Sequence, residues 1–160
     1  MTKIDNEIII KIRQIVRSIN LESKKIQKEY GVSIPQVLCL SYIRDAPNFQ
    51  TTQKNIRNYL NLNASTVTGI INRLEKKGYI ARLPKLGDKR ITSITLTGSG
   101  QTLLNQLPPL LQEQLVAKIS ELPPEKVEYI KGGLDELIQL LNISNLDASP
   151  VLTTEDRINT

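Results

Sequence analysis

The chain of 160 residues carries a net charge of +5 at neutral pH, contains one cysteine, and lacks histidine and tryptophan. This length suffices for one domain with a core, or for a small domain with an oligomerisation element, and the core must be mainly Ile, Leu and Val because only 4% of the residues are aromatic. A single cysteine cannot form an internal disulfide, and a chain without histidine lacks the commonest metal ligand, so we expect no metal site and no cofactor. No apolar run approaches the roughly 20 residues of a membrane span, and the first residues are not a secretory signal. We therefore expect a cytoplasmic protein without membrane contact.

Residues 3 to about 30 are predicted to form one long helix. Isoleucines at intervals of four and three residues define its apolar face: Ile4, Ile8, Ile12, Ile15 and Ile19. A helix of about 28 residues spans roughly 40 Å, longer than a compact domain of this size can cover by itself. We therefore expect another subunit to bury part of this face. The alternative is a helix that lies on its own domain.

Two shorter helices are predicted next. One begins at Ser33 and ends near Asp45, and its residues are apolar on most sides, so it should lie at the centre of the fold. A third helix, capped by Thr51 or Thr52, should run to Leu60. Free N–H groups at the start of this third helix favour a phosphate, and the candidate contacts there are Thr52, Gln53 and Lys54.

The fourth predicted helix, residues 63 to 77, has two contrasting faces. Its apolar positions follow helical spacing at Val67, Ile70, Ile71 and Leu74, which predicts one buried stripe. The rest of its surface carries short polar or basic residues: Ser65, Thr66, Thr68, Gly69, Asn72, Arg73 and Lys76. Short side chains let a helix approach base edges in a DNA major groove, and Asn and Arg offer bidentate hydrogen bonds. The pattern predicts a DNA-reading helix.

A basic β-hairpin is predicted after this helix, which Gly78 should end. Apolar positions from Tyr79 to Leu83 and from Ile91 to Leu96 indicate two strands. The candidate contacts of this hairpin are Arg82, Lys85, Asp88, Lys89 and Arg90. Residues 62–97 hold seven basic and two acidic side chains, a net +5 that equals the charge of the whole chain. Positive charge concentrated in this way is typical of a phosphate-binding surface.

The segment STVTGIINRLEKKGYI at residues 65–80, followed by DKR at 88–90 and ITLTGSG at 94–100, resembles the winged helix-turn-helix core of the MarR family of transcription regulators. The resemblance is close over about residues 50–104. It implies that Asp88 holds Arg90 in a wing that reaches into or beside the minor groove. Arg57 departs from the family's pattern, in which a small residue commonly packs between the two helices, so either the helix spacing or the orientation of Arg57 should differ from the family's.

The remaining residues predict further helices interrupted by proline pairs. Thr97 should cap a helix that Pro108-Pro109 kinks or breaks, and Pro123-Pro124 should begin the last one. The predicted fold is mainly α with a small β-hairpin wing (α+β). Its domains are a helical dimerisation domain (1–32 and 98–142), as the resemblance implies, a winged helix-turn-helix DNA-binding domain (33–97), and a partly mobile tail (143–160).

The resemblance implies a homodimer that binds a pseudo-palindromic operator on double-stranded DNA, as a repressor released by a small-molecule or other effector. In the family, effectors often bind between the dimerisation helices and the winged domain. Candidates here are Arg13, Arg17, Tyr30 and Tyr42. Family members that sense oxidants through a cysteine carry it in the first helix, whereas Cys39 lies in an apolar run of the second, which favours a buried thiol over a redox switch.

Two other classes of function fit the sequence less well. A winged-helix module that binds protein or RNA would have an apolar or acidic outer face on the fourth helix, which this sequence lacks. An enzyme is not expected, since the chain has no paired carboxylates, glycine-rich phosphate loop or nucleophile–base set at a useful spacing.

Overall fold

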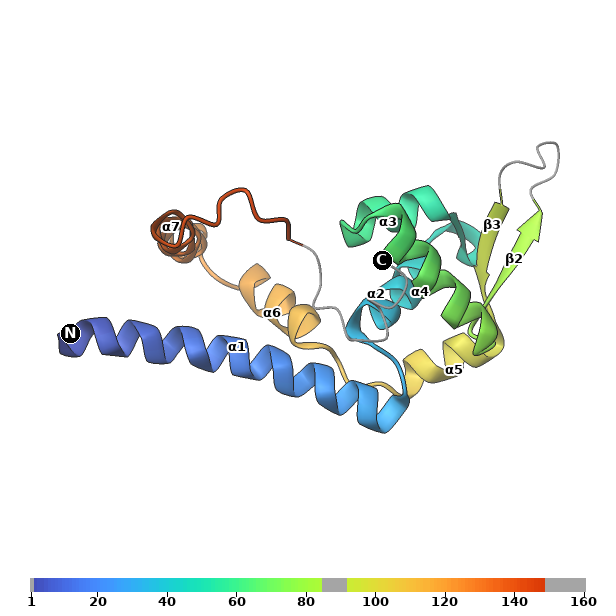
Figure 1. Ribbon diagram of the computed structural model, residues 1–160, viewed down its shortest axis with the longest axis horizontal. Helices are drawn as coiled ribbons and strands as arrows, with labels where there is room; N and C mark the ends of the chain where they lie inside the picture. Colours follow the sequence, from blue (N-terminus) through green and yellow to red (C-terminus); the bar gives the residue numbers. More distant parts are fainter. Residues whose placement is uncertain (1, 85–91, 149–160) are drawn as a thin grey trace. The chain divides into compact units, whose positions relative to one another are not determined.

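The computed structural model describes residues 2–84 and 92–148 (Figure 1). By its internal contacts the chain divides into one unit that runs to Leu107 and a second unit over Pro108–Ala148. The first unit holds five of the helices and all strands of the described residues, and the second holds the last two helices. The fold is thus mainly helical with a small antiparallel sheet, as predicted.

Helix α1 (Lys3–Tyr30) has the length that its isoleucine spacing predicts. Thr2 and Asp5 form a capping box at its start, and Gly31 ends it in the left-handed conformation with φ 71°. Only Ser23 and Ile26 of its 28 residues are buried. Most of its apolar face is therefore open in the single chain.

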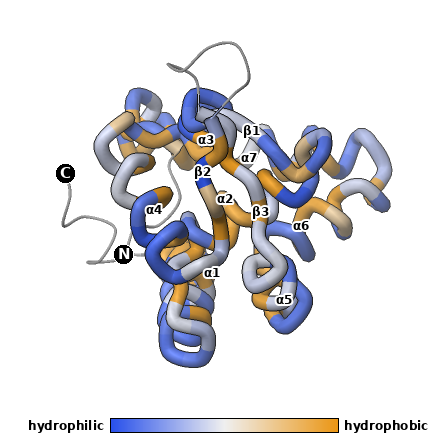
Figure 2. The backbone as a smooth tube through the Cα atoms, turned by 90° about the vertical axis from the view of Figure 1, so that its right-hand side faces the viewer, coloured by the Kyte–Doolittle hydropathy of each residue, from blue (hydrophilic) through white to orange (hydrophobic). Residues whose placement is uncertain are grey.

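Helix α2 (Ile34–Asp45) is the centre of the first unit. Its cap is Ser33, whose hydroxyl accepts from the N–H of Gln36, while the Gln36 side chain accepts from the Ser33 N–H. Eight of its twelve residues are buried, and it packs against α1, α3, α4, α5 and β3. Figure 2 shows hydrophobic segments, in orange, around α2 and β2.

A 3₁₀ turn (Pro47–Phe49) and a short strand β1 (Gln50–Thr52) follow α2, and the sequence did not predict this strand. Thr51 belongs to β1, and Thr52 is the cap of helix α3 (Gln53–Leu60). β1 was missed because three residues are too few to show an alternating pattern, and its partner β3 lies more than 40 residues further on.

Helix α4 (Ala64–Lys76) is capped by Asn63, whose side-chain oxygen accepts from the N–H of Thr66. Asn61, with φ 56°, ends α3 and so makes the turn between the two helices. Gly78, with φ 82°, lies just beyond α4 and turns the chain into the sheet, as its position predicts.

The sheet has three antiparallel strands in the order β1-β3-β2, with β2 at Ile80–Pro84 and β3 at Thr92–Leu96. The predicted hairpin is therefore present, and β1 extends it to three strands. Ile80 pairs with Leu96. The predicted strand position Ile91 lies outside the described residues. Buried apolar side chains from helices and sheet form one core: Val37, Leu38, Leu40, Ile43, Ile56, Leu60, Val67, Ile70, Ile71, Leu74, Ile80, Ile94, Leu103 and Leu104.

Thr97 connects the sheet to helix α5 (Gly98–Gln106). Its hydroxyl donates to the carbonyl oxygen of Gly78 at 2.6 Å and accepts from the N–H of Gly100 at 3.2 Å. Its own N–H donates to the carbonyl oxygen of Tyr79 at 3.1 Å. One residue thus caps α5 and joins it to the end of α4.

The second unit contains α6 (Leu111–Ser120) and α7 (Pro124–Leu140). The proline pairs act as predicted, because α5 ends at Gln106 before Pro108 and α7 begins within the second pair. Neither α6 nor α7 has a buried residue. Among the described helices, none combines the length and apolar character needed to cross a membrane. The described part of the predicted tail, 143–148, contains no helix or strand.

Gly100 is expected to be intolerant of a side chain. A Cβ atom there would lie inside contact distance of the Tyr79 carbonyl oxygen and of a methyl group of Leu96. We expect Gly100→Ala to lower the free energy of unfolding by about 1–3 kcal/mol, measured by urea denaturation. Gly98→Ala is the control, because no atom lies within 4 Å of its Cβ position. Equal stability of the two variants would contradict the close approach.

Candidate nucleic-acid interface

The outer face of α4 presents polar and basic groups to solvent. Ser65, Asn72 and Lys76 are exposed and recur at helical spacing, on the side away from the buried Ile70 and Leu74. The hydroxyl of Ser65 donates to the side-chain oxygen of the cap. The side chains of this face are polar and exposed, which is what entry into a major groove requires.

Two residues predicted on the outer face of α4 are buried. Thr66 is 1% exposed, and Gly69 is also buried. The reason is that α4 packs against three elements, α2, α3 and β2, so its buried face is wider than the predicted stripe. These two residues therefore belong to the packed face of α4 and not to its outer face. Arg73 is half-buried.

A side-chain hydrogen bond links the two helices of the helix-turn-helix. Gln53 at the start of α3 donates from its Nε2 to the Oγ1 of Thr68 at 2.7 Å, and Thr68 donates to the Ala64 carbonyl oxygen. The Thr52 hydroxyl is occupied in capping α3. Of the three predicted phosphate contacts at this helix start, Lys54 is the exposed one.

Arg57 does not separate α3 from α4. Its side chain is exposed, and Ile56 and Leu60 form the buried edge of α3 instead. The two helices are in contact despite the departure from the family's pattern.

Arg82 on β2 reaches across to α4. Its Nη1 donates to Oε1 of Glu75 at 2.7 Å, and its Nη2 donates to Oδ1 of Asn72 at 2.6 Å. The guanidinium therefore lies against α4. Glu75 was not predicted to belong to this site, although it is the lone acidic residue between positions 62 and 87. That isolated negative charge, among basic residues, was the feature of the sequence from which an ion pair at this site could have been predicted.

Lys77, at the end of α4, bonds to the junction of α1 and α2. Its Nζ donates to the carbonyl oxygen of Gly31 at 2.8 Å and to Oε1 of Gln36 at 3.4 Å. Gln36 is fully buried. This ammonium group therefore caps the carbonyl at the end of α1 and ties the end of α4 to the α1–α2 junction. Four predicted wing residues, Lys85, Asp88, Lys89 and Arg90, lie outside the described residues.

The four predicted effector residues do not share one pocket in the described chain. Arg13 and Arg17 line a cavity of about 370 Å³ along α1, together with Lys24. The Tyr30 hydroxyl donates to the Gln106 carbonyl oxygen, and the Tyr42 ring stacks on Tyr59 with centroids 4.6 Å apart. The four residues differ in surroundings because α1 extends beyond the core that holds Tyr42.

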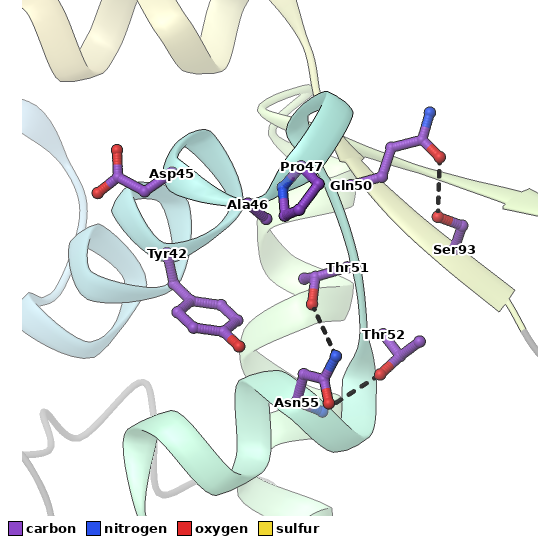
Figure 3. A pocket seen from close by; sticks show the side chains of 9 residues that line it. All are labelled: Tyr42, Asp45, Ala46, Pro47, Gln50, Thr51, Thr52, Asn55 and Ser93. Atoms are coloured by element: carbon purple, nitrogen blue, oxygen red, sulfur yellow. Dashed lines mark hydrogen bonds between the residues drawn. The ribbon is translucent and has the colours of Figure 1, made fainter.

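Tyr42 lines another cavity, of about 550 Å³, where the end of α2 meets β1, α3 and β3 (Figure 3). Its polar side chains bond mainly to one another. Asn55 donates to the Thr51 hydroxyl, and Ser93 donates to Gln50. These bonds hold β1 between α3 and β3.

Cys39 is fully buried in α2. Burial raises the pKa of its thiol to about 12, because a thiolate loses hydration there. The group is therefore protonated at neutral pH, and reaction at sulfur needs the thiolate. The described residues also contain no group of three His, Cys, Asp or Glu side chains that could hold a metal ion.

Comparison with solved structures defines the class of fold. The chain superposes on a DNA complex of MepR from S. aureus with a TM-score of 0.62 and 25% identity, over 81% of this chain and 94% of that one. It also matches Sco3205, a MarR family regulator of Streptomyces coelicolor solved in complex with DNA, with a TM-score of 0.63 and 18% identity, over 96% and 97% of the two chains. Helices α3 and α4 with the β2–β3 hairpin form a winged helix-turn-helix domain.

Sequence comparison finds similarity to one family over part of the chain. Residues 32–92 match the model of the MarR family. The chain is 32% identical over 77 residues to the homoprotocatechuate degradative operon repressor of Escherichia coli, covering 48% of this chain and 52% of the relative. It is 34% identical over 85 residues to the regulator PecS of Dickeya dadantii, covering 52% and 51%. The chain spans about half the length of these curated relatives, which are named as regulators and not as enzymes. Residues 32–92 therefore carry a MarR-family domain.

Lys77 and Lys76 are expected to differ in what they stabilise. Lys77→Met keeps the aliphatic stem but removes the hydrogen bonds to Gly31 and Gln36, so we expect a loss of about 1 kcal/mol in the free energy of unfolding. Lys76→Met, at an exposed position one residue earlier, should change stability by less than about 0.5 kcal/mol. Urea denaturation of both variants measures this, and equal losses would contradict the assigned role.

Proposed function

We propose that this protein is a sequence-specific DNA-binding transcriptional regulator that inserts α4 into the major groove. The observation that carries the proposal is the exposed outer face of α4, where Asn72 and Lys76 stand clear of the core that holds the opposite face. The name of the Escherichia coli relative, a repressor, and the DNA complexes among the structural neighbours support it. We propose that the protein represses transcription and that it acts in the cytoplasm.

Phosphate contacts would supply most of the affinity. Lys76 at the end of α4 and Lys54 at the start of α3 are exposed lysines on the two helices of the motif. The basic wing tip, with Lys85, Lys89 and Arg90, is proposed to add contacts beside them. Such contacts release counterions from DNA, so binding should weaken steeply as salt rises.

A homodimer is the proposed binding unit. Helices α1, α6 and α7 leave large apolar side chains exposed in the single chain, including Ile8, Leu115 and Leu134 at 43%, 58% and 48%. A helix that exposes its apolar stripe needs a partner, and a second copy offers the same stripes in return. Residues 1–32 and 98–142 are the proposed dimerisation domain. A two-fold dimer would set two copies of α4 about one DNA turn (~34 Å) apart on a pseudo-palindrome.

The effector is proposed to be an anion with an apolar body. The cavity along α1 combines the cationic Arg13, Arg17 and Lys24 with the apolar Ile12 and Val16. It is a shallow site on one helix, which the proposed partner helices would complete. The assay for this role measures the DNA complex while aromatic carboxylates are added. The wild-type complex should be lost, and the complex of Arg17→Ala should be retained.

A module that binds protein without reading DNA is the competing function. It would need an apolar or acidic outer face on α4, whereas this face carries Ser65, Asn72 and Lys76. The observations therefore favour DNA.

DNA binding is tested by titrating the full chain onto the DNA upstream of its own gene across a salt series. Asn72→Ala should remove one base contact in each half-site and cost about 1–3 kcal/mol of selectivity per half-site. Lys76→Met should weaken binding to all sequences and lower the log–log salt slope by about 0.9 for each phosphate that is no longer neutralised. Arg90→Ala tests the wing in the same assay.

Lys28→Met, an exposed lysine on α1, is the control and should behave as wild type. Binding that is indifferent to DNA sequence and to these substitutions would overturn the assignment of α4. The protein-binding module would then become the leading function.

The dimer is tested by light scattering of the full chain, whose mass is 18.0 kDa. We expect about twice that mass for wild type. Leu134→Glu places a charge in the α7 stripe beside Ile130 and Ile138, so it should shift the mass toward 18.0 kDa. Lys131→Gln, at an exposed polar position of the same helix, should leave the dimer intact. A monomeric wild-type protein would refute the proposed assembly.

A further inference from the structure

The outer face of α4 is held by a three-residue network that the wing strand supplies. The Arg82 guanidinium donates to Glu75 at 2.7 Å and to the amide oxygen of Asn72 at 2.6 Å. The side chains of Arg82 and Glu75 are 31% and 40% exposed, so the network lies at the edge of the proposed groove-binding face. Asn72 itself is exposed.

The donor chemistry of arginine determines how Asn72 is presented. A guanidinium group can only donate, so the side-chain oxygen of Asn72 must face Arg82 and the NH₂ group must point away from it. Glu75 holds the other side of the guanidinium, which limits its rotation. Asn72 therefore presents its side-chain NH₂ group, in a fixed orientation, to the DNA bases.

Base recognition depends on this orientation. An unrestrained asparagine reads adenine with both ends of the amide, accepting from N6 and donating to N7. Arg82 takes one of the two lone pairs of the amide oxygen and fixes the rotation of the amide, so the NH₂ group is the end left to face the bases. Adenine and thymine each offer this donor one major-groove acceptor, N7 and O4, whereas guanine offers two, N7 and O6. The ion pair with Glu75 also offsets the charge of Arg82, which argues against a separate phosphate contact.

We propose that Arg82 is a positioning residue that, by holding the side-chain oxygen of Asn72, makes this asparagine select guanine in place of adenine in each half-site. The inference rests on the proposed DNA-binding function and adds to it the base that one residue reads. Asn72 contacts the base, and Arg82 acts through Asn72.

The test selects binding sites from a randomised DNA pool with the full chain and four variants: Arg82→Met, Asn72→Ala, the double variant and Arg44→Met. Wild type should prefer guanine at one position of each half-site, and Asn72→Ala should lose that preference. Arg82→Met should move it toward adenine by about tenfold, since the freed amide can pair at both ends. The double variant should match Asn72→Ala, and the salt slope of Arg82→Met should equal that of wild type.

Arg44→Met is the matched control, because Arg44 on α2 pairs with Asp45 at 3.0 Å and is 36% exposed, close to the values for Arg82. It should leave the selected sequence unchanged. A salt slope lowered by about 0.9 per half-site in Arg82→Met, with base preference intact, would show a direct phosphate contact and overturn the inference. An adenine preference in wild type would overturn it as well.

Failure of the proposed function gives a different result. If wild type selects no sequence, both the function and the role of Arg82 are rejected. If it selects DNA while the side-chain NH₂ signals of Asn72 in the free protein are the same in wild type and Arg82→Met by NMR, the function stands and the positioning role is rejected. A change in those signals is the expected result.

Discussion

The hydrogen bond from the Thr97 hydroxyl to the Gly78 carbonyl oxygen, at 2.6 Å, is the constraint on which the placement of the β2–β3 hairpin beside α4 depends. Gly78 turns the chain out of α4 into β2, and Thr97 brings β3 back to the same point before it caps α5. Because the ends of the hairpin are fixed against α4, the side chains of β2 have a defined position over that helix. Arg82 reaches Glu75 and Asn72 for this reason.

Packing of its buried face against the core holds α4 in position while its outer face presents polar groups. Residues of α2, α3 and β2 bury six of its thirteen positions, two more than the apolar stripe alone. Thr66 and Gly69 are buried with it, and small residues at these positions allow close packing. What remains outside is a narrow polar face, in which Gln53 donates to the half-buried Thr68 and Arg82 donates to the exposed Asn72.

Positive charge in this domain has two uses that composition alone does not separate. Lys77 and Arg82 contribute to the local charge that indicated a phosphate-binding surface. Both, however, form hydrogen bonds within the protein, Lys77 to the end of α1 and Arg82 to α4. Lys54 and Lys76 are exposed. Fewer phosphates should therefore be contacted than the number of basic residues suggests. Lys76 and the wing tip would make a larger share of those contacts.

The sequence by itself determined the helices, several of their caps and the hairpin, because helical spacing, Ser33, Thr97 and the prolines act over a few residues. It also carried the motifs that match the MarR family. Only the tertiary structure decided that β1 joins the sheet, that α4 buries Thr66 and Gly69, and that Arg82 and Lys77 bond within the fold. Each of these depends on residues that are distant in the chain or on neighbouring elements, which local patterns do not encode.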